Sequence, residues 1–269
     1  MPEPTPSSAG RVIEGATRLT IEGGVASVVF DRPAARNAMT WAMYRQLGAI
    51  CDRLATESGV RVVCFRGAGG EAFVAGTDIE QFKEFKDGAA GVAYEQRIDE
   101  CMARLDALPM PTVAVIEGWA VGGGLAIATA CDIRIATPTA RLGVPIAKTL
   151  GNCLSMANLA RLVAAFGRPR VQRMLIGAEI LKAEEALACG YLAEVVPAET
   201  IDAAAATLCQ RLASLAPVTQ AVSKEGLRRL MLQNLPDAQD LILRSYGSDD
   251  FREGVNAFSD KRTPVWRGR

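Results

Sequence analysis

The chain has 269 residues, of which 49% are hydrophobic and 22% charged, and its 30 basic and 30 acidic residues cancel. This length is sufficient for a large buried core, and the zero net charge gives no electrostatic reason to expect a nucleic-acid partner. The chain contains no histidine, which excludes Ser-His-Asp and Cys-His catalytic groups and histidine-bound metals, so any acid or base must be Asp, Glu, Lys, Tyr or Cys.

The cysteines and the chain start bear on where the protein works. Seven cysteines are scattered without a Cys-x-x-Cys pair, which is typical of reduced thiols rather than of a metal site. Residues 1–14 are rich in Pro and Ser and lack the features of a signal or transit peptide, so we expect a disordered tail. Residues 112–132 are apolar, but Glu117, Asp132 and three glycines argue against a membrane span. We therefore expect a cytoplasmic protein with no membrane contact and no metal.

The first half of the chain alternates strand-like and helix-like segments. A hairpin is predicted over residues 19–30 around Glu22-Gly23-Gly24, and Thr40 is the expected cap of a helix that runs to about Glu57. The next predicted segments are a buried strand over 60–66, a glycine-rich loop over 67–76, a short helix from Asp78 that includes Phe82 and Phe85, a helix over 90–108, a strand over 112–116, a helix after 122–124 and a strand over 133–136. This repeated order implies a parallel sheet covered by helices.

The second half is predicted to be mainly helical. The expected helices cover residues 152–166, 168–176, 183–189, 199–215, 217–232, 237–246 and 249–260, and only 192–196 is predicted as a strand. Asn152 is the expected cap of the first of these helices. We therefore predict an α/β core over residues 15–197 and a C-terminal helical extension over residues 198–269.

Two glycine loops each join a predicted strand to a helix, and both suggest an anion site. The first contains Gly76 and Thr77, and the second is Gly122 to Gly124. Glycine allows the tight backbone path, and the first amides of a helix are free to bind negative charge. Because neighbouring parallel strands end at one edge of a sheet, we predict that the amides of Thr77 and Gly123 face one oxygen, as in an oxyanion hole.

A dinucleotide-binding site is the alternative interpretation of the glycine-rich loop. Residues 67–72, Gly-Ala-Gly-Gly-Glu-Ala, follow a predicted strand and fit the pattern G-x-G-x-x-A. The residues after this pattern, however, lack the helical period that a dinucleotide site requires.

The motifs, in their order along the chain, resemble those of the crotonase (enoyl-CoA hydratase/isomerase) superfamily over about residues 18–265. The segments that carry this resemblance are Arg32-Pro33-Ala34-Ala35-Arg36-Asn37-Ala38, Phe73-Val74-Ala75-Gly76-Thr77-Asp78-Ile79, Gly118-Trp119-Ala120-Val121-Gly122-Gly123-Gly124, Cys131-Asp132-Ile133-Arg134, residues 177–196, and residues 250–262. The fourth segment is structural in the family.

The resemblance implies a spiral of ββα units with a parallel sheet, an acyl-CoA thioester as substrate, and oxyanion-hole amides at Thr77 and Gly123. Coenzyme A would be part of the substrate, and no cofactor would be bound permanently. The expected substrate- or CoA-binding residues are Ala34, Ala35, Arg36, Ala75, Gly76, Asp78, Ile79, Gly122, Phe258 and Lys261. The resemblance also implies a homotrimer or homohexamer.

The chain departs from the family at the two glutamates that position and activate water in hydratases. Ala126 and Ile146 stand at those positions. Proton transfer by a positioned side chain is typically worth ~10²–10⁴ in rate, so we expect isomerisation, decarboxylation or another enolate reaction in place of hydration. The alternative is a non-catalytic acyl-CoA-binding paralogue that serves as a sensor or partner subunit.

Other polar residues are candidates for the missing acid or base. Lys148 is a candidate base if it is desolvated, and Glu80 and Glu84 follow the first oxyanion loop. Each has a simpler interpretation, as a solvated lysine or as part of an exposed helix face. Glu117 is expected to pair with a neighbouring loop, and Tyr94 to pack in the core.

Overall fold

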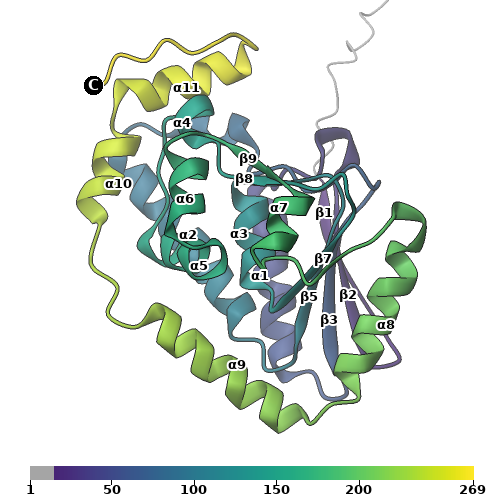
Figure 1. Ribbon diagram of the computed structural model, residues 1–269. Helices are drawn as coiled ribbons and strands as arrows, with labels where there is room; N and C mark the ends of the chain where they lie inside the picture. The colour runs from purple at the N-terminus through teal and green to yellow at the C-terminus, as the bar shows by residue number, and fades with distance from the viewer. Residues whose placement is uncertain (1–14) are drawn as a thin grey trace, which may run out of the picture.

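The computed structural model describes residues 15–269, so the predicted tail over residues 1–14 lies outside the described residues. The described chain forms two sheets with helices around them (Figure 1). The six-stranded sheet has the order β1 (Ala16–Glu22), β2 (Val25–Asp31), β3 (Val62–Gly67), β5 (Thr112–Ile116), β7 (Ile133–Ala136) and β10 (Glu194–Val195). The four-stranded sheet has the order β4 (Ala72–Val74), β6 (Trp119–Val121), β8 (Arg141–Gly143) and β9 (Ile180–Lys182).

From β3 to β8, successive strands alternate between the two sheets, and this alternation forms a repeated ββα unit. The large-sheet strands β3, β5 and β7 are parallel neighbours, and each is followed along the chain by a strand of the small sheet, β4, β6 or β8. A helical segment then follows each pair: η2 (Ile79–Glu84) with α2 (Gly88–Asp106), α3 (Gly123–Ala130), and α4 (Ile146–Thr149). The predicted spiral of ββα units is therefore confirmed.

Helices cover both faces of the large sheet. On one face, α1 (Trp41–Thr56), α2 and α3 enclose the main core together with buried side chains such as Phe30 and Phe65. On the other face lies α8 (Ile201–Ala213), which packs its buried residues against Val113 and Val115 of β5 (Figure 1). Apolar side chains on both faces of β5 explain why this strand is a continuous apolar run in the sequence.

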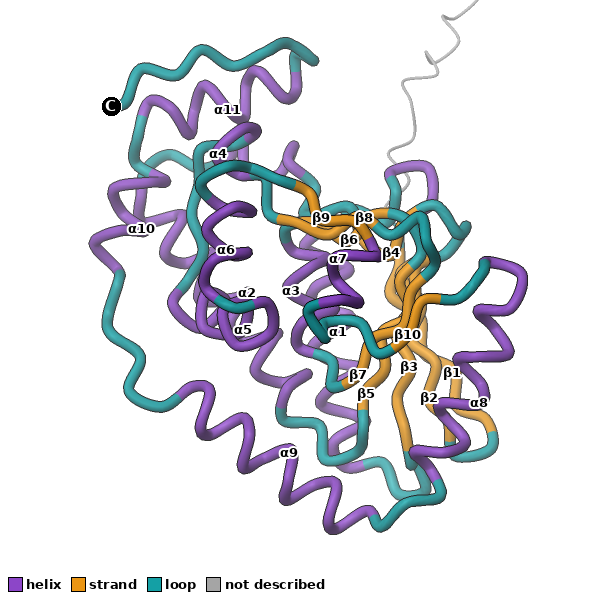
Figure 2. The backbone as a smooth tube through the Cα atoms, viewed as in Figure 1, coloured by secondary structure: helices purple, strands orange, loops and turns teal. Residues whose placement is uncertain are grey.

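The remaining helices are α5 (Met156–Phe166), α6 (Arg168–Leu175), α7 (Ala183–Ala188), α9 (Pro217–Leu232), α10 (Gln239–Tyr246) and α11 (Asp249–Ser259), with short 3₁₀ turns η1 (Pro33–Ala35) and η3 (Ala198–Thr200). Figures 1 and 2 show α9 along the outside of the molecule, joined by residues 233–238 to α10. The chain then returns to the body, where α10 packs on α2 and α11 packs on η2. Within residues 15–269, no helix is both long and apolar enough to span a bilayer.

Most predicted segments are present, and the differences are local. Ser155, not Asn152, caps α5: its side chain accepts a hydrogen bond from the Asn158 amide, so the helix begins at Met156. The segment predicted as a loop over 67–76 contains β4. Because Gly67–Ala72 leads into a strand and not into a helix, the dinucleotide-binding alternative is wrong. The division of the chain at residue 198 stays a prediction.

Candidate active site

The two glycine loops lie against each other at one edge of the small sheet. They follow β4 and β6, which are parallel neighbours with Val74 opposite Ala120. A Cβ atom built on Gly123 would lie 3.1 Å from Thr77 Oγ1, and one built on Gly122 would lie 3.8 Å from the Cα atom of Gly76. Gly76 and Gly122 have φ angles of +103° and +52°, which few other residues adopt. The two loops therefore lie together, as predicted for loops that follow neighbouring parallel strands.

The amides of Thr77 and Gly123 are both without a protein partner. Gly123 is the first residue of α3, where a backbone N–H has no acceptor within the helix. The backbone on either side of Thr77 pairs with Met39, since the Met39 amide donates to Gly76 O and the Asp78 amide donates to Met39 O. In the part of the chain that the structure describes, neither the Thr77 nor the Gly123 amide donates a hydrogen bond. Two such donors on touching loops are what a carbonyl oxygen with developing negative charge requires.

A row of three hydroxyl groups lies beside these loops. Thr77 Oγ1 is 2.9 Å from Tyr44 Oη and 3.1 Å from Tyr94 Oη. Burial raises the pKa of both tyrosines above the ordinary value, so both are protonated at neutral pH. A Cβ atom on Gly123 would collide with Tyr44 Oη, which explains why this position needs glycine. Tyr94 is buried as predicted, but its contact with Thr77 has no signal in the sequence because it depends on how α1 and α2 pack.

The segment from Arg32 to Asn37 braces the first oxyanion loop. The buried Asn37 side chain donates to Ala68 O and Ala72 O, both at 2.8 Å, and Arg32 pairs with Asp78 at 2.8 Å. The Ala75 amide donates to Arg36 O at 3.0 Å. Ala34 and Arg36 are exposed and Ala35 is half-buried. These predicted CoA-binding residues therefore lie on an accessible rim next to the Thr77 loop.

Helix α11 brings the C-terminal CoA-binding candidates to η2. Ser259 Oγ donates to Glu80 Oε1 at 2.8 Å, which joins the end of α11 to the start of η2. Phe258 is 51% exposed, and Lys261 is exposed beyond the helix end. These two residues thus lie at the end of α11, the helix that packs on η2.

The three candidate acid or base residues are all at the surface. Glu80 is paired with Lys83, and this pairing together with the Ser259 hydroxyl lowers the pKa of its carboxyl. Glu84 and Lys148 are exposed, as their simpler interpretations predicted. None of the three lies in a buried setting.

Ala126 and Ile146 border the same edge of the small sheet as the loops. The Ala126 amide donates to Gly122 O at 3.1 Å, so this residue lies in the first turn of α3. Ile146 begins α4 directly after β8, the neighbour of β6. Both side chains are partly buried and pack against the main core. The walls at these two positions are therefore apolar.

A buried carboxyl near the hydroxyl row was missed by the sequence analysis. Glu95 is 3% exposed, and its carboxyl accepts hydrogen bonds from Tyr246 Oη at 2.6 Å and the Ser155 amide at 3.0 Å. Burial raises the pKa of Glu95 to about 7. Asn152 Nδ2 donates to Tyr246 Oη at 3.1 Å, while Asn152 Oδ1 is buried without a partner. The position of Glu95 within an amphipathic helix gives no warning of this network.

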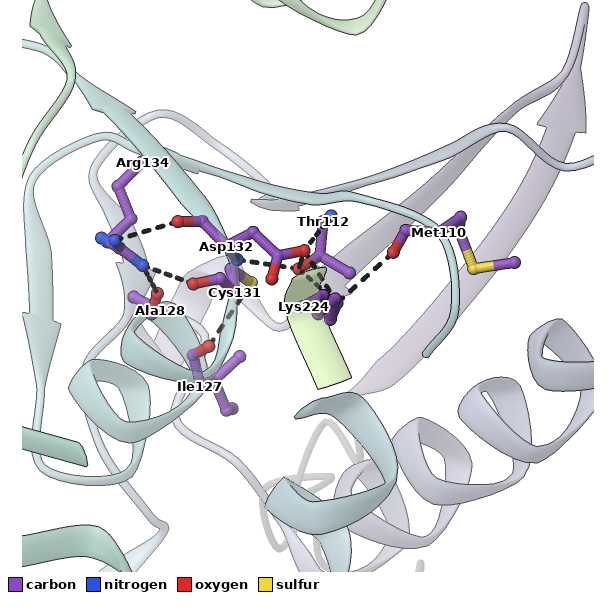
Figure 3. A network of polar contacts seen from close by, with 8 residues as sticks. All are labelled: Met110, Thr112, Ile127, Ala128, Cys131, Asp132, Arg134 and Lys224. Atoms are coloured by element: carbon purple, nitrogen blue, oxygen red, sulfur yellow. Dashed lines mark hydrogen bonds and ion pairs between the residues drawn. The ribbon is translucent and has the colours of Figure 1, made fainter. Parts of the chain in front are cut away.

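The Cys131-Asp132-Ile133-Arg134 segment has the structural role expected for it. Figure 3 shows Asp132 held by the Thr112 amide and hydroxyl and by Lys224, whose Nζ lies 2.7 Å from Asp132 Oδ2. Arg134 donates to backbone oxygens of Ala128 and Cys131. Elsewhere Glu117 pairs at 2.7 Å with Arg66, which lies in the strand β3 and not in a loop as predicted.

Comparison with known proteins identifies the class to which this fold and site belong. The family model for enoyl-CoA hydratase/isomerase matches residues 20–269. The chain is 31% identical to the short-chain-enoyl-CoA hydratase of Clostridium acetobutylicum, over 90% of this chain and 93% of the relative. It is also 31% identical to the 2,3-dehydroadipyl-CoA hydratase of Escherichia coli K12, over 90% and 94% of the two chains. The chain therefore belongs to the enoyl-CoA hydratase/isomerase family and is an acyl-CoA enzyme of that family.

Solved structures show the same fold. A crystal structure of an enoyl-CoA hydratase from Mycobacterium avium subsp. paratuberculosis has a TM-score of 0.81 and 31% identity, covering 93% of this chain and 98% of that chain. Methylmalonyl-CoA decarboxylase in complex with 2-nitronate-propionyl-CoA has a TM-score of 0.86 and 25% identity, covering 94% and 98%. The crotonase-type α/β fold with C-terminal helices is thus confirmed.

Proposed function

We propose that the protein binds an acyl-CoA thioester and stabilises its enolate between the amides of Thr77 and Gly123. The observation that carries this proposal is the pair of unpartnered amides on touching loops. Backbone donors that are fixed before the reaction stabilise charge that develops on oxygen, and one such donor is typically worth about 10²–10³ in rate. A thioester oxygen held in this way makes chemistry at the α-carbon possible.

Coenzyme A would enter as part of the substrate and lie along the accessible rim. The exposed Ala34 and Arg36 and the half-buried Ala35 lie next to the Thr77 loop, to which they are joined by the hydrogen bond from the Ala75 amide to Arg36 O. Phe258 and Lys261 lie at the end of α11, which packs on η2. They would contact the coenzyme A part of the substrate, in this subunit or in a neighbouring one.

The reaction differs from the hydration that the names of its relatives suggest. Ala126 and Ile146 occupy the positions at which the family resemblance places two glutamates, and neither side chain can hold or move a proton. The exposed Lys148, Glu80 and Glu84 offer no equivalent buried acid or base. The function that best fits these residues is an enolate reaction independent of the glutamate pair, such as isomerisation or decarboxylation.

The test measures how much the thioester carbonyl contributes to binding. Calorimetry measures the affinity for butyryl-CoA and for S-butyl-CoA, a thioether that lacks the carbonyl oxygen. We expect the wild-type protein to prefer the thioester about tenfold, since two hydrogen bonds are at stake. Gly123→Ala removes this preference, because the added methyl collides with Tyr44 and displaces the amide. Gly226→Ala on α9, where an added Cβ meets nothing within 4 Å, is the matched control.

Two results would contradict the proposal. Equal affinity of the wild-type protein for thioester and thioether would mean that the amides do not bind the carbonyl. Tight thioester binding without turnover of crotonyl-CoA or any other thioester in a panel would indicate a non-catalytic acyl-CoA-binding protein.

A further inference from the structure

The row of hydroxyls formed by Tyr44, Thr77 and Tyr94 has one proton more than its internal hydrogen bonds use. Each hydroxyl brings one O–H donor, and two hydrogen bonds join the three oxygens. Among residues 15–269, no other group accepts a hydrogen bond from any of these hydroxyls. Whichever way the protons are arranged, one O–H remains to be donated to a molecule other than the protein.

This remaining donor lies next to the proposed thioester position. Thr77 carries both the central hydroxyl and one of the two free amides. A Cβ atom built on Gly123, the residue with the second amide, would collide with Tyr44 Oη and lie 3.1 Å from Thr77 Oγ1. A carbonyl oxygen bound to the two amides would therefore lie beside the row, and its α-carbon would be next to that oxygen.

The same site offers no group that would take a proton away. Ala126 and Ile146 are apolar, and Lys148 is exposed. Glu95, the nearest buried carboxyl on α2, is already occupied by Tyr246 and Ser155. A site with donors and no base can form an enolate only from a substrate that loses a neutral fragment and leaves its electron pair behind.

A carboxylate on the α-carbon is the group that leaves in this way, as carbon dioxide. Apolar walls at Ala126 and Ile146 suit such a substrate, because glutamates at these positions would repel its carboxylate. The acyl group also has to be short on the side of the tyrosines. The Tyr94 ring lies 5.0 Å from Phe82 and 5.4 Å from Trp41, centroid to centroid, so these rings pack against one another on that side.

We infer that the Tyr44–Thr77–Tyr94 hydroxyl row is the proton donor of a decarboxylation, and that the substrate is a short acyl-CoA with a carboxylate on its α-carbon. This inference rests on the proposed function. The bond from the α-carbon to the carboxylate breaks, carbon dioxide leaves, and the electron pair passes to the thioester enolate held by the two amides. The row then gives its free proton to the α-carbon, forming the C–H bond. Water returns a proton to the row through the half-exposed Thr77, so one proton is consumed per turnover.

The experiment uses the full chain with racemic methylmalonyl-CoA as the probe in deuterated water. The wild-type protein is expected to release propionyl-CoA with one deuterium at the α-carbon in predominantly one configuration. The double variant Tyr44→Phe, Tyr94→Phe keeps both aromatic rings and leaves the Thr77 hydroxyl as the one remaining hydroxyl of the row. We expect kcat to fall about 10²-fold or more, KM to change less than about threefold, and the remaining product to carry deuterium in both configurations.

Tyr191→Phe is the matched control, because its buried hydroxyl also bonds to a threonine, Thr129, but lies outside the site. If the double variant fails to fold, Thr77→Val serves instead, since it keeps the amide and breaks the row. Wild-type rate and wild-type stereochemistry in either folded variant would overturn the inference. Butyryl-CoA binding without decarboxylation by the wild-type protein would overturn it while leaving the proposed function intact, whereas failure to bind butyryl-CoA would overturn both.

Discussion

In the proposed function, the choice of reaction depends on Ala126 and Ile146. Both lie at the edge that carries the oxyanion loops, and both present apolar side chains there. Replacing them together with glutamate (Ala126→Glu, Ile146→Glu) would supply the acid and base that the family resemblance places at these positions, and it also adds negative charge. We expect crotonyl-CoA hydration to rise by about 10²-fold and decarboxylation of methylmalonyl-CoA to fall, because the new carboxylates repel the substrate carboxylate.

Hydration is followed by loss of the absorbance of the unsaturated thioester, and decarboxylation by release of carbon dioxide. The double glutamine variant, Ala126→Gln with Ile146→Gln, has the same side-chain size without the acid groups and is expected to hydrate no faster than the wild-type protein. If the glutamate and glutamine variants are equally active on crotonyl-CoA, these positions are not those of the acid and base.

Glu95 gives the folded protein a pH dependence whose sign follows from its burial. Its pKa is raised from 4.5 to about 7 in the folded state, so between these values the folded chain binds the proton more strongly than the unfolded chain does. The contribution of this group is fully present below pH 4.5 and is lost as the pH rises through 7. The loss is roughly 3 kcal/mol in the free energy of unfolding.

Glu95→Gln keeps a neutral side chain in place at every pH and is expected to remove this loss. The amide can donate to Tyr246 Oη, which is then free to donate to the unpartnered Asn152 Oδ1 after a flip of the Asn152 amide. Thermal unfolding of both proteins from pH 4 to pH 8 measures the difference. The melting temperature of the wild-type protein should fall below that of the variant as the pH rises, and parallel curves would contradict this assignment.

At the scale of elements, Lys224 joins α9 to the core through an ion pair and hydrogen bonds. None of the residues of α9 is buried, and Lys224 reaches Asp132 of the core together with Met110 O (Figure 3). Lys224→Met removes these charge-assisted hydrogen bonds, each worth about 1.5–3 kcal/mol. We expect amide hydrogen exchange in α9 to accelerate about 10- to 100-fold, with much smaller changes in α1 and α2. Arg229→Met, which removes a cation from the exposed side of the same helix, is the control and should leave exchange in α9 unchanged.

Whether an element could be predicted from the sequence depends on its length and on the spacing of its apolar residues. The long helices were predicted because their apolar residues recur with a helical period, and the two oxyanion loops because glycines follow short apolar runs. The strands β4, β6, β8 and β9 have three residues each, which is too short for a period of two to stand out. The contact of Tyr44 and Tyr94 with Thr77 joins three separate segments, so it exists only after α1, α2 and the loop have packed.

At the scale of the whole molecule, the C-terminal helices lie in two places. Helices α10 and α11 return to α2 and η2, whereas α9 stays outside the body in Figure 2. The exposed apolar side chains of α9 are Val218 and Val222, with exposures of 74% and 62%, and, further round the helix, Leu227 and Leu230, with 69% and 71%. Monomeric proteins rarely leave so much apolar surface on one element uncovered.

The trimer or hexamer expected from the family resemblance would cover these side chains. Two cavities of about 490 and 340 Å³ flank α9, one lined in part by Val222 and the other by Val218, so a neighbouring chain has space to fill beside both valines. Light scattering on the eluting protein should give three or six times 28.6 kDa. Two double variants test this interface. One combines Val218→Glu with Val222→Glu, and the other combines Leu227→Glu with Leu230→Glu. At least one of them should dissociate the assembly, because burying a glutamate without a partner costs several kcal/mol. A wild-type protein with the mass of a single chain, or an assembly that both variants leave intact, would show that α9 is not the interface.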